Sequence, residues 1–251
     1  MTDRAALFAN VLNAPADDTA RLVLADWLEE HDEEALGRFI RAGVVASHFR
    51  GVELISDPEY YEALRTLSDV TTAGEPARWL AALGIGPPPP PGPGWAWDNE
   101  GDRVTVRIGA TSGVFTRGLL SELILPLQDW YDHASQALAA WPLERATITN
   151  VPGLTFWIDA PNNDSPEWKV TVAFTVQPRR RARRGVFARL ESLLGGENPP
   201  PSPVPVGRWT AERTFPDRAT LVRLSHDVWP VLFDEVRHAA GATGLVEFRP
   251  T

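Results

Sequence analysis

Apolar residues in the first 86 positions recur with the period of an amphipathic helix. The clearest stripe follows the i, i+3, i+4, i+7, i+8 pattern and consists of Ala20, Val23, Leu24, Trp27 and Leu28. A second stripe consists of Leu36, Phe39, Ile40 and Val44. Typical helix starts occur at Asp17 or Asp18, at Asp57-Pro58 and at Glu75-Pro76, and Gly84 is a stop signal. The pattern predicts a small bundle of four or five short helices.

Beyond residue 94 the apolar period changes to two, which indicates β-strands. The alternating segments lie at residues 104–108, 156–158, 168–174 and 209–215. Residues 161–166 have the Pro and Asn content of a turn, so the strands on either side are expected to form a hairpin. Residues 119–125, 127–140 and 146–149 predict a strand, a helix and a second strand, which a right-handed crossover would make parallel to the first.

A second strand–helix–strand unit is expected between residues 209 and 248. Its helical part spans residues 217–240 and contains Pro230, which is expected to kink the helix or to divide it in two. Asp227 would then cap the part of the helix that contains Pro230. Residues 245–248 would form the last strand of the unit.

The proline-rich residues 87–94 form the best candidate for a boundary between domains, because proline restricts the backbone to an extended spacer. We therefore expect an α+β protein. Residues 1–86 would form the helical bundle and residues 95–251 a mixed β-sheet covered by helices. A basic helical insertion is expected at about residues 178–205, where a second proline tract ends a long loop.

Composition narrows the classes of protein that fit this chain. Its 251 residues include no Cys, 43% are hydrophobic, and the net charge is −9. These values exclude a disulfide-rich scaffold, a thiol enzyme and a wholly disordered chain. No segment has the apolar length needed to cross a bilayer, and the start lacks a signal-peptide pattern, so we expect a cytoplasmic protein.

Two stretches resemble a known bacterial family. Residues 22–31 read L-V-L-A-D-W-L-E-E-H, and Phe39-Ile40-Arg41 follow. They resemble the repeat-companion domain, whose hallmark is an A-D-W-L-E-E helix followed by a helix with F-I-R. Residues 117–143, which begin R-G-L-L, are similar to the segment that often follows this domain. In such relatives that segment leads into leucine-rich repeats, whereas no period of about 20 to 30 residues is found here.

The resemblance implies a helical module and supplies no catalytic residue or cofactor. On the expected helix, Trp27 lies in the apolar stripe and is predicted to be a buried anchor. Asp26, Glu29 and Glu30 lie off that stripe. They are either solvated surface residues or a docking surface for a basic partner.

The chain also offers few candidates for chemistry, and we expect neither a metal nor a cofactor. Common hydrolase, nucleotide-binding and zinc-protease motifs are absent. Asp129 and His133 are four residues apart on a predicted helix, which suits either a surface pair or half of a general base. The acidic loops at residues 98–102 and 159–167 are better explained as hairpin turns than as calcium sites.

The most unusual segment is basic and amphipathic. Six basic and two acidic residues occur between positions 178 and 198. The candidate contacts of this segment are Arg179, Arg180, Arg181, Arg183, Arg184, Phe187, Leu190 and Leu194. It could dock an acidic protein surface, which includes the acidic helical module of the same chain, or bind nucleic acid or an anionic membrane.

The leading interpretation is a non-catalytic protein–protein interaction or adaptor protein with an unidentified partner. The first alternative is binding of an anionic surface through residues 179–194. The second is an enzyme with an unrecognised site around Asp129 and His133.

Overall fold

The computed structural model describes residues 3–52, 56–85, 95–161, 165–176 and 207–242. Five helices precede the sheet: α1 (Asp3–Asn13), α2 (Asp18–Glu30), α3 (Glu34–Ser47), α4 (Pro58–Thr72) and α5 (Glu75–Ala82). The caps predicted from sequence are present, because the side chains of Asp17 and Asp57 accept hydrogen bonds from the N–H groups of Thr19 and Glu59. The chain leaves α5 through Gly84, whose φ of +73° is readily adopted by glycine.

The second half of the fold is built on one eight-stranded sheet in which strand order follows chain order. The strands are β1 (Trp95–Glu100), β2 (Arg103–Ile108), β3 (Thr111–Thr116), β4 (Leu119–Leu125), β5 (Arg145–Ile148), β6 (Leu154–Asp159), β7 (Trp168–Val176) and β8 (Gly207–Phe215). Neighbouring strands are antiparallel except for β4 and β5. This parallel pair is joined through α6 (Leu127–Ala140), as the sequence predicted, and the α+β class is confirmed.

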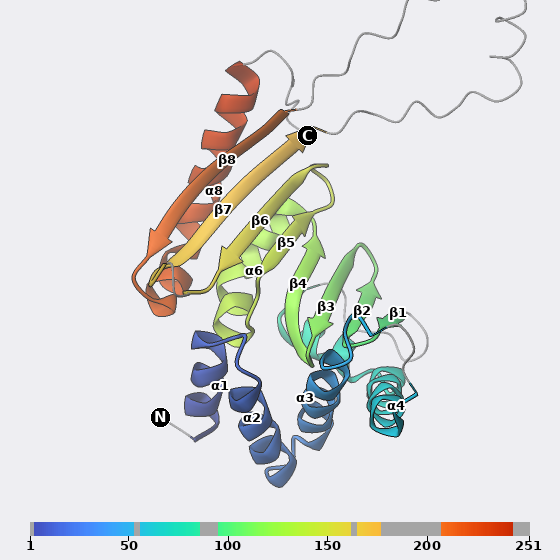
Figure 1. Ribbon diagram of the computed structural model, residues 1–251. Helices are drawn as coiled ribbons and strands as arrows, with labels where there is room; N and C mark the ends of the chain where they lie inside the picture. Colours follow the sequence, from blue (N-terminus) through green and yellow to red (C-terminus); the bar gives the residue numbers. More distant parts are fainter. Residues whose placement is uncertain (1–2, 53–55, 86–94, 162–164, 177–206, 243–251) are drawn as a thin grey trace, which may run out of the picture.

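Helices cover one face of the sheet (Figure 1). Helix α6 packs on β5, and α8 (Arg218–Ala242) packs on β7, β8 and α6. Burial alternates along β6 between the two faces of the sheet. Leu154, Phe156 and Ile158 are buried, whereas Trp157 is only partly buried and Asp159 is exposed. The core under α6 and α8 contains Trp130, Trp229 and Phe156, whose ring centroids lie 5.3 to 5.6 Å apart.

The helical bundle docks on the tight turn between β3 and β4. Arg117 and Gly118 both have positive φ, +50° and +74°, which suits a two-residue hairpin turn. A Cβ on Gly118 would lie 2.2 Å from the Cα of Ile40, so the backbone of α3 touches this turn. Arg21 donates to the carbonyls of Pro15 and Arg117 from a buried position. The two parts of the sequence therefore share one continuous apolar core.

Some local expectations require correction. Helix α8 continues through Pro230 rather than dividing there, so Asp227 lies inside the helix and caps nothing. Trp27 is only partly buried and stacks on His31 with centroids 4.0 Å apart. Strands β1 and β3 were not predicted. The expected strand at 245–248, the spacer at 87–94 and the insertion at about 178–205 all include residues outside the described ranges.

None of the helices in the described ranges has both the length and the hydropathy that a membrane span requires.

Candidate functional site

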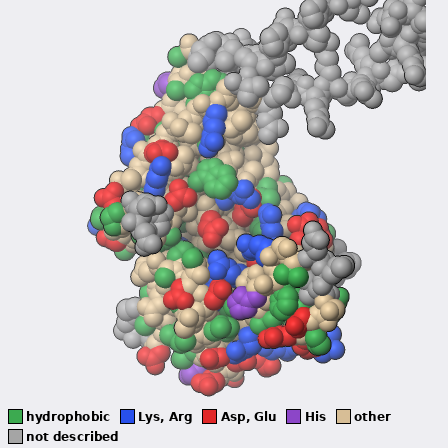
Figure 2. Space-filling model, in the orientation of Figure 1, with side chains coloured by type: hydrophobic (Ala, Val, Ile, Leu, Met, Phe, Trp, Pro, Cys, Tyr) green, Lys and Arg blue, Asp and Glu red, His purple; other side chains and the backbone are tan. Residues whose placement is uncertain are grey.

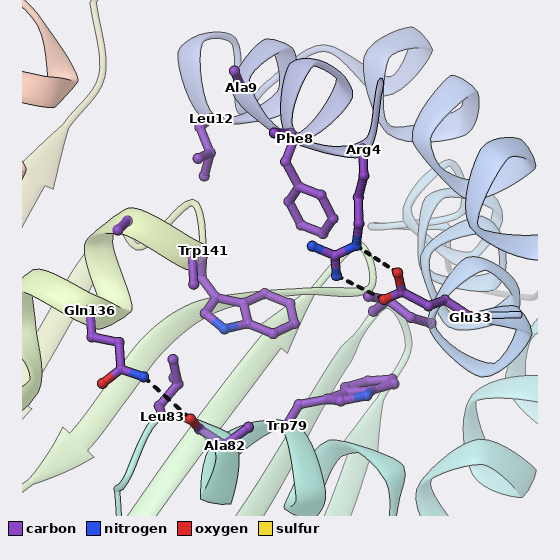
Figure 3. A pocket seen from close by; sticks show the side chains of 14 residues that line it. Arg4, Phe8, Ala9, Leu12, Glu33, Trp79, Ala82, Leu83, Gln136 and Trp141 are labelled. Carbon is purple, nitrogen blue, oxygen red and sulfur yellow. Dashed lines mark hydrogen bonds and ion pairs between the residues drawn. The ribbon is translucent and has the colours of Figure 1, made fainter. Parts of the chain in front are cut away.

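A well-defined hollow in the described part of the chain lies where the helical bundle meets α6. It is a groove of about 620 Å³, within the size range of ligand and peptide pockets. Its lining comes from α1, the α2–α3 turn, α3, α5 and α6 with the residue that follows it. Figure 3 shows Phe8, Trp79 and Trp141 directed toward the shared space, with Arg4 and Glu33 beside it. We call this feature the aromatic groove.

The aromatic wall of the groove is supported from below by the core. The ring centroids of Trp79 and Trp141 lie 6.4 Å apart. Behind them, Phe115 makes edge-on contacts with both indoles, at 5.9 and 6.1 Å. Aromatic pairs at such distances favour tilted or edge-to-face geometry, which fixes the orientation of each ring. The wall is therefore preformed by packing between the bundle and the sheet.

An ion pair closes one side of the aromatic groove. Arg4 donates from Nε and Nη2 to the two carboxylate oxygens of Glu33, at 2.6 and 2.8 Å. The same guanidinium lies 4.7 Å from the ring centroid of Phe8, within the range of a cation–π contact. The hydrogen bond to Glu33 raises the pKa of Arg4. The pair ties α1 to the α2–α3 turn and leaves the groove with apolar walls and a charged rim.

Arg218, which no sequence motif singled out, organises the groove from behind. Its side chain is buried and donates to the carbonyls of Leu138 and Trp141, at 2.7 and 2.5 Å, and to that of Leu12 at 3.5 Å. Burial lowers its pKa to about 10. These carbonyls belong to the ends of α6 and α1, whose backbone groups have no partner within the helix. The cation therefore joins two of the helices that form the groove.

Two of the three acidic residues predicted as a docking surface form ion pairs within the chain. Arg41 of α3 pairs with both Asp26 and Glu29 of α2, and the Glu29 contact measures 3.1 Å. Glu30 is exposed near the end of α2. Gly37 allows the close approach of the two helices, since a Cβ there would lie 2.7 Å from the carbonyl oxygen of Ala25. The two parts of the family hallmark thus contact each other directly.

Of the other site residues predicted from the sequence, some lie within the described ranges and some lie outside them. Asp129 and His133 form no ion pair or hydrogen bond with each other among the described contacts, and the ring of His133 lies against Gly84 instead. Asp102, from the first acidic loop, is buried and accepts a hydrogen bond of 2.5 Å from Arg50. The eight candidate residues between Arg179 and Leu194 lie outside the described ranges. Within those ranges no group of three metal-ligating side chains is present.

The second face of the sheet carries mixed charge. Figure 2 shows basic and acidic side chains interspersed over this side of the molecule. Near its centre, buried Glu122 accepts hydrogen bonds from Arg103, Arg145 and Thr147, and Arg145 lies 5.0 Å from the ring centroid of Trp157. Lys169 and Glu212 pair at 2.7 Å. These charges of the described residues are therefore paired with each other within the sheet, and opposite signs alternate where a polyanion would need one sign.

Comparisons with models of known families, with curated proteins and with solved structures each found no match.

Proposed function

We propose that this chain is a non-catalytic protein–protein interaction protein and that its aromatic groove receives a large apolar side chain of the partner. The observation that carries the proposal is the set of Phe8, Trp79 and Trp141 directed into a groove of about 620 Å³ beside the Arg4–Glu33 pair. Tryptophan, tyrosine and arginine are the residue types that contribute most to protein interfaces, above all in well-packed pockets.

The polar groups of the groove favour binding over chemistry. Arg4 and Glu33 satisfy each other, and the side chain of Gln136 donates to the carbonyl oxygen of Ala82 at 3.3 Å. General acid–base or nucleophilic catalysis needs a reactive group within hydrogen-bond reach of the bound molecule. The lining instead presents aromatic and aliphatic surface. A complex is stabilised when a partner covers such a surface and removes it from water.

We also propose that the chain is related to repeat-companion proteins. The contact of Arg41 with Asp26 and Glu29 supports this, because the residues that carry the resemblance form one structural unit. The docking of α3 on Gly118 supports it further, since this glycine belongs to the second similar stretch.

Filling the groove tests the proposed function. Ala139 is an exposed residue of α6 that lines the groove, and Ala239 is an exposed alanine of α8 outside it. We expect Ala139→Trp to reduce at least tenfold the recovery of a co-purifying partner from native cell extract. Ala239→Trp is the matched control and should leave recovery unchanged. Equal recovery with both variants would contradict the proposal.

A further inference from the structure

We propose that residues 179–194 of this same chain occupy the aromatic groove when no partner is bound. We call these residues the basic arm. The inference rests on the proposed function of the groove and adds the identity of its resting occupant. Four observations carry it: the position of the groove, the length of chain available, the spacing of apolar residues in the arm, and the charge of the rim.

The groove lies within reach of the arm. The arm departs after Val176 and returns before Gly207, and these two residues pair with each other at one end of β7 and β8. The opposite end of β7 is Trp168, whose ring lies 4.8 Å from the guanidinium of Arg218. Arg218 in turn bonds the carbonyls of Leu12 and Trp141, which line the groove. The distance to cover is therefore one strand length plus the step from Trp168 through Arg218 to the groove.

The chain that precedes Phe187 and the chain that follows Leu194 are both long enough to cover this distance. Strand β7 has 9 residues and so spans about 26 Å between its first and last Cα atoms. Phe187 lies eleven positions after Val176, and an extended chain of eleven steps spans up to ~36–40 Å. Gly207 lies thirteen positions after Leu194, and an extended chain of thirteen steps spans up to ~43–47 Å. Both spans exceed the length of β7 by about 10 Å or more, which leaves chain for the step from Trp168 to the groove while both ends of the arm remain attached to the sheet.

The apolar residues of the arm match the groove in type and spacing. Phe187, Leu190 and Leu194 follow an i, i+3, i+7 pattern, which places them on one face if the segment is helical. An amphipathic helix binds a hydrophobic groove through three or four such anchors. Three large side chains of this kind correspond to the apolar wall formed by Phe8, Trp79, Trp141 and their aliphatic neighbours.

Charge favours the same arrangement. The arm and its flanks, residues 178–198, carry six basic and two acidic groups. Beside the groove, exposed Glu30 ends α2 and exposed Asp32 lies in the α2–α3 turn, and exposed Asp3 neighbours Arg4 on α1. Opposite charges on two surfaces raise the rate and strength of association, and the effect weakens with salt. The hollow between α3 and α4 has about half the volume of the groove and, at about 320 Å³, is a poorer match for three large anchors.

Engineered disulfides test this inference in the full chain. The natural sequence contains no Cys, so two introduced cysteines have no competing thiol. We expect Leu190→Cys with Ala139→Cys to form an intramolecular disulfide at least ten times faster than Leu190→Cys with Ala239→Cys. The control is stringent, because α8 runs back along β8 and places Ala239 near the end of the sheet where the arm is attached.

The outcomes separate the two proposals. Equal rates for the two pairs, or a disulfide that links two chains, would overturn occupancy by the arm of the same molecule. If this occurs while Ala139→Trp still removes the partner, the groove remains a partner site with a different resting state. If Ala139→Trp has no effect on the partner, the proposed function itself is contradicted.

Discussion

At the scale of single residues, Arg218 joins the ends of α1 and α6 behind the aromatic groove. A buried cation is costly, and the lowered pKa of about 10 in place of 12.5 means that the folded state binds this proton less tightly than the unfolded state. Its carbonyl partners at the ends of α1 and α6 offset this cost. Their loss would leave buried acceptors without donors.

We therefore expect Arg218→Met to lower the free energy of unfolding by about 2–4 kcal/mol, measured by urea denaturation. Arg223→Met, at an exposed position of the same helix, should change it by less than about 0.5 kcal/mol. Equal effects of the two substitutions would show that the buried contacts of Arg218 contribute no specific stability.

Tyr131 provides a test in which the substitution is expected to raise the free energy of unfolding. Its hydroxyl group is buried and has no hydrogen-bond partner among the described residues, and burial raises its pKa to about 12. Because the unfolded phenol ionises near pH 10, the stability that comes from keeping it neutral is complete below pH 10 and falls as the pH rises toward 12. Tyr131→Phe should raise the free energy of unfolding by about 1 kcal/mol and remove this alkaline loss. A clear decrease in stability at neutral pH would refute the absence of a partner.

At the scale of elements, the contact between α3 and the β3–β4 turn should be intolerant of a single methyl group. Gly118→Ala places a Cβ 2.2 Å from the Cα of Ile40, in addition to the cost of a positive φ. Gly51 also has a positive φ, +82°, but has no neighbour within 4 Å of an added Cβ. We expect Gly118→Ala to cost more than about 3 kcal/mol and Gly51→Ala only about 1 kcal/mol. Similar costs would mean that α3 does not press on this turn.

Elements with a regular pattern were predictable from the sequence, and the others failed for physical reasons. The apolar run 119–125, the helix 127–140 and the strand after it predicted the parallel pair correctly, because each has a clear period and its own boundaries. Strand β3 shows no alternation, since Val114 and Phe115 are both buried around a bulge. Strand β1 follows directly on the proline tract, and its Trp-Ala-Trp start did not suggest a paired edge.

The aromatic groove itself could not be predicted, because its lining comes from segments that are distant in sequence. In the sequence, Phe8 and Trp79 look like ordinary apolar positions of amphipathic helices, and Trp141 has no pattern beyond its place before Pro142. Arg4 and Glu33 are 29 residues apart and pair only after α1 packs on α2. The basic arm, which stands out in the sequence, is the proposed occupant of the groove and gives no indication of the groove itself.

At the scale of the whole molecule, the continuous core implies that bundle and sheet unfold together. Native-state hydrogen exchange should give buried amides in α3 and in β4 the same free energy of opening, within about 1 kcal/mol. Opening of α3 at several kcal/mol below β4 would show that the bundle is an independent unit. The groove would then not be preformed, since its walls come from both parts.

The most direct test of the central claim is site-specific photo-crosslinking of the full chain in its native cells. A benzophenone side chain replaces Ala139 in the groove, and in the control it replaces Ala239 on α8. The account predicts that the groove position attaches at high yield to one defined apolar segment, which mass spectrometry identifies as residues 179–194 or as part of a partner. Diffuse labelling at the same low yield from both positions would contradict the claim that the aromatic groove is the binding site of this protein.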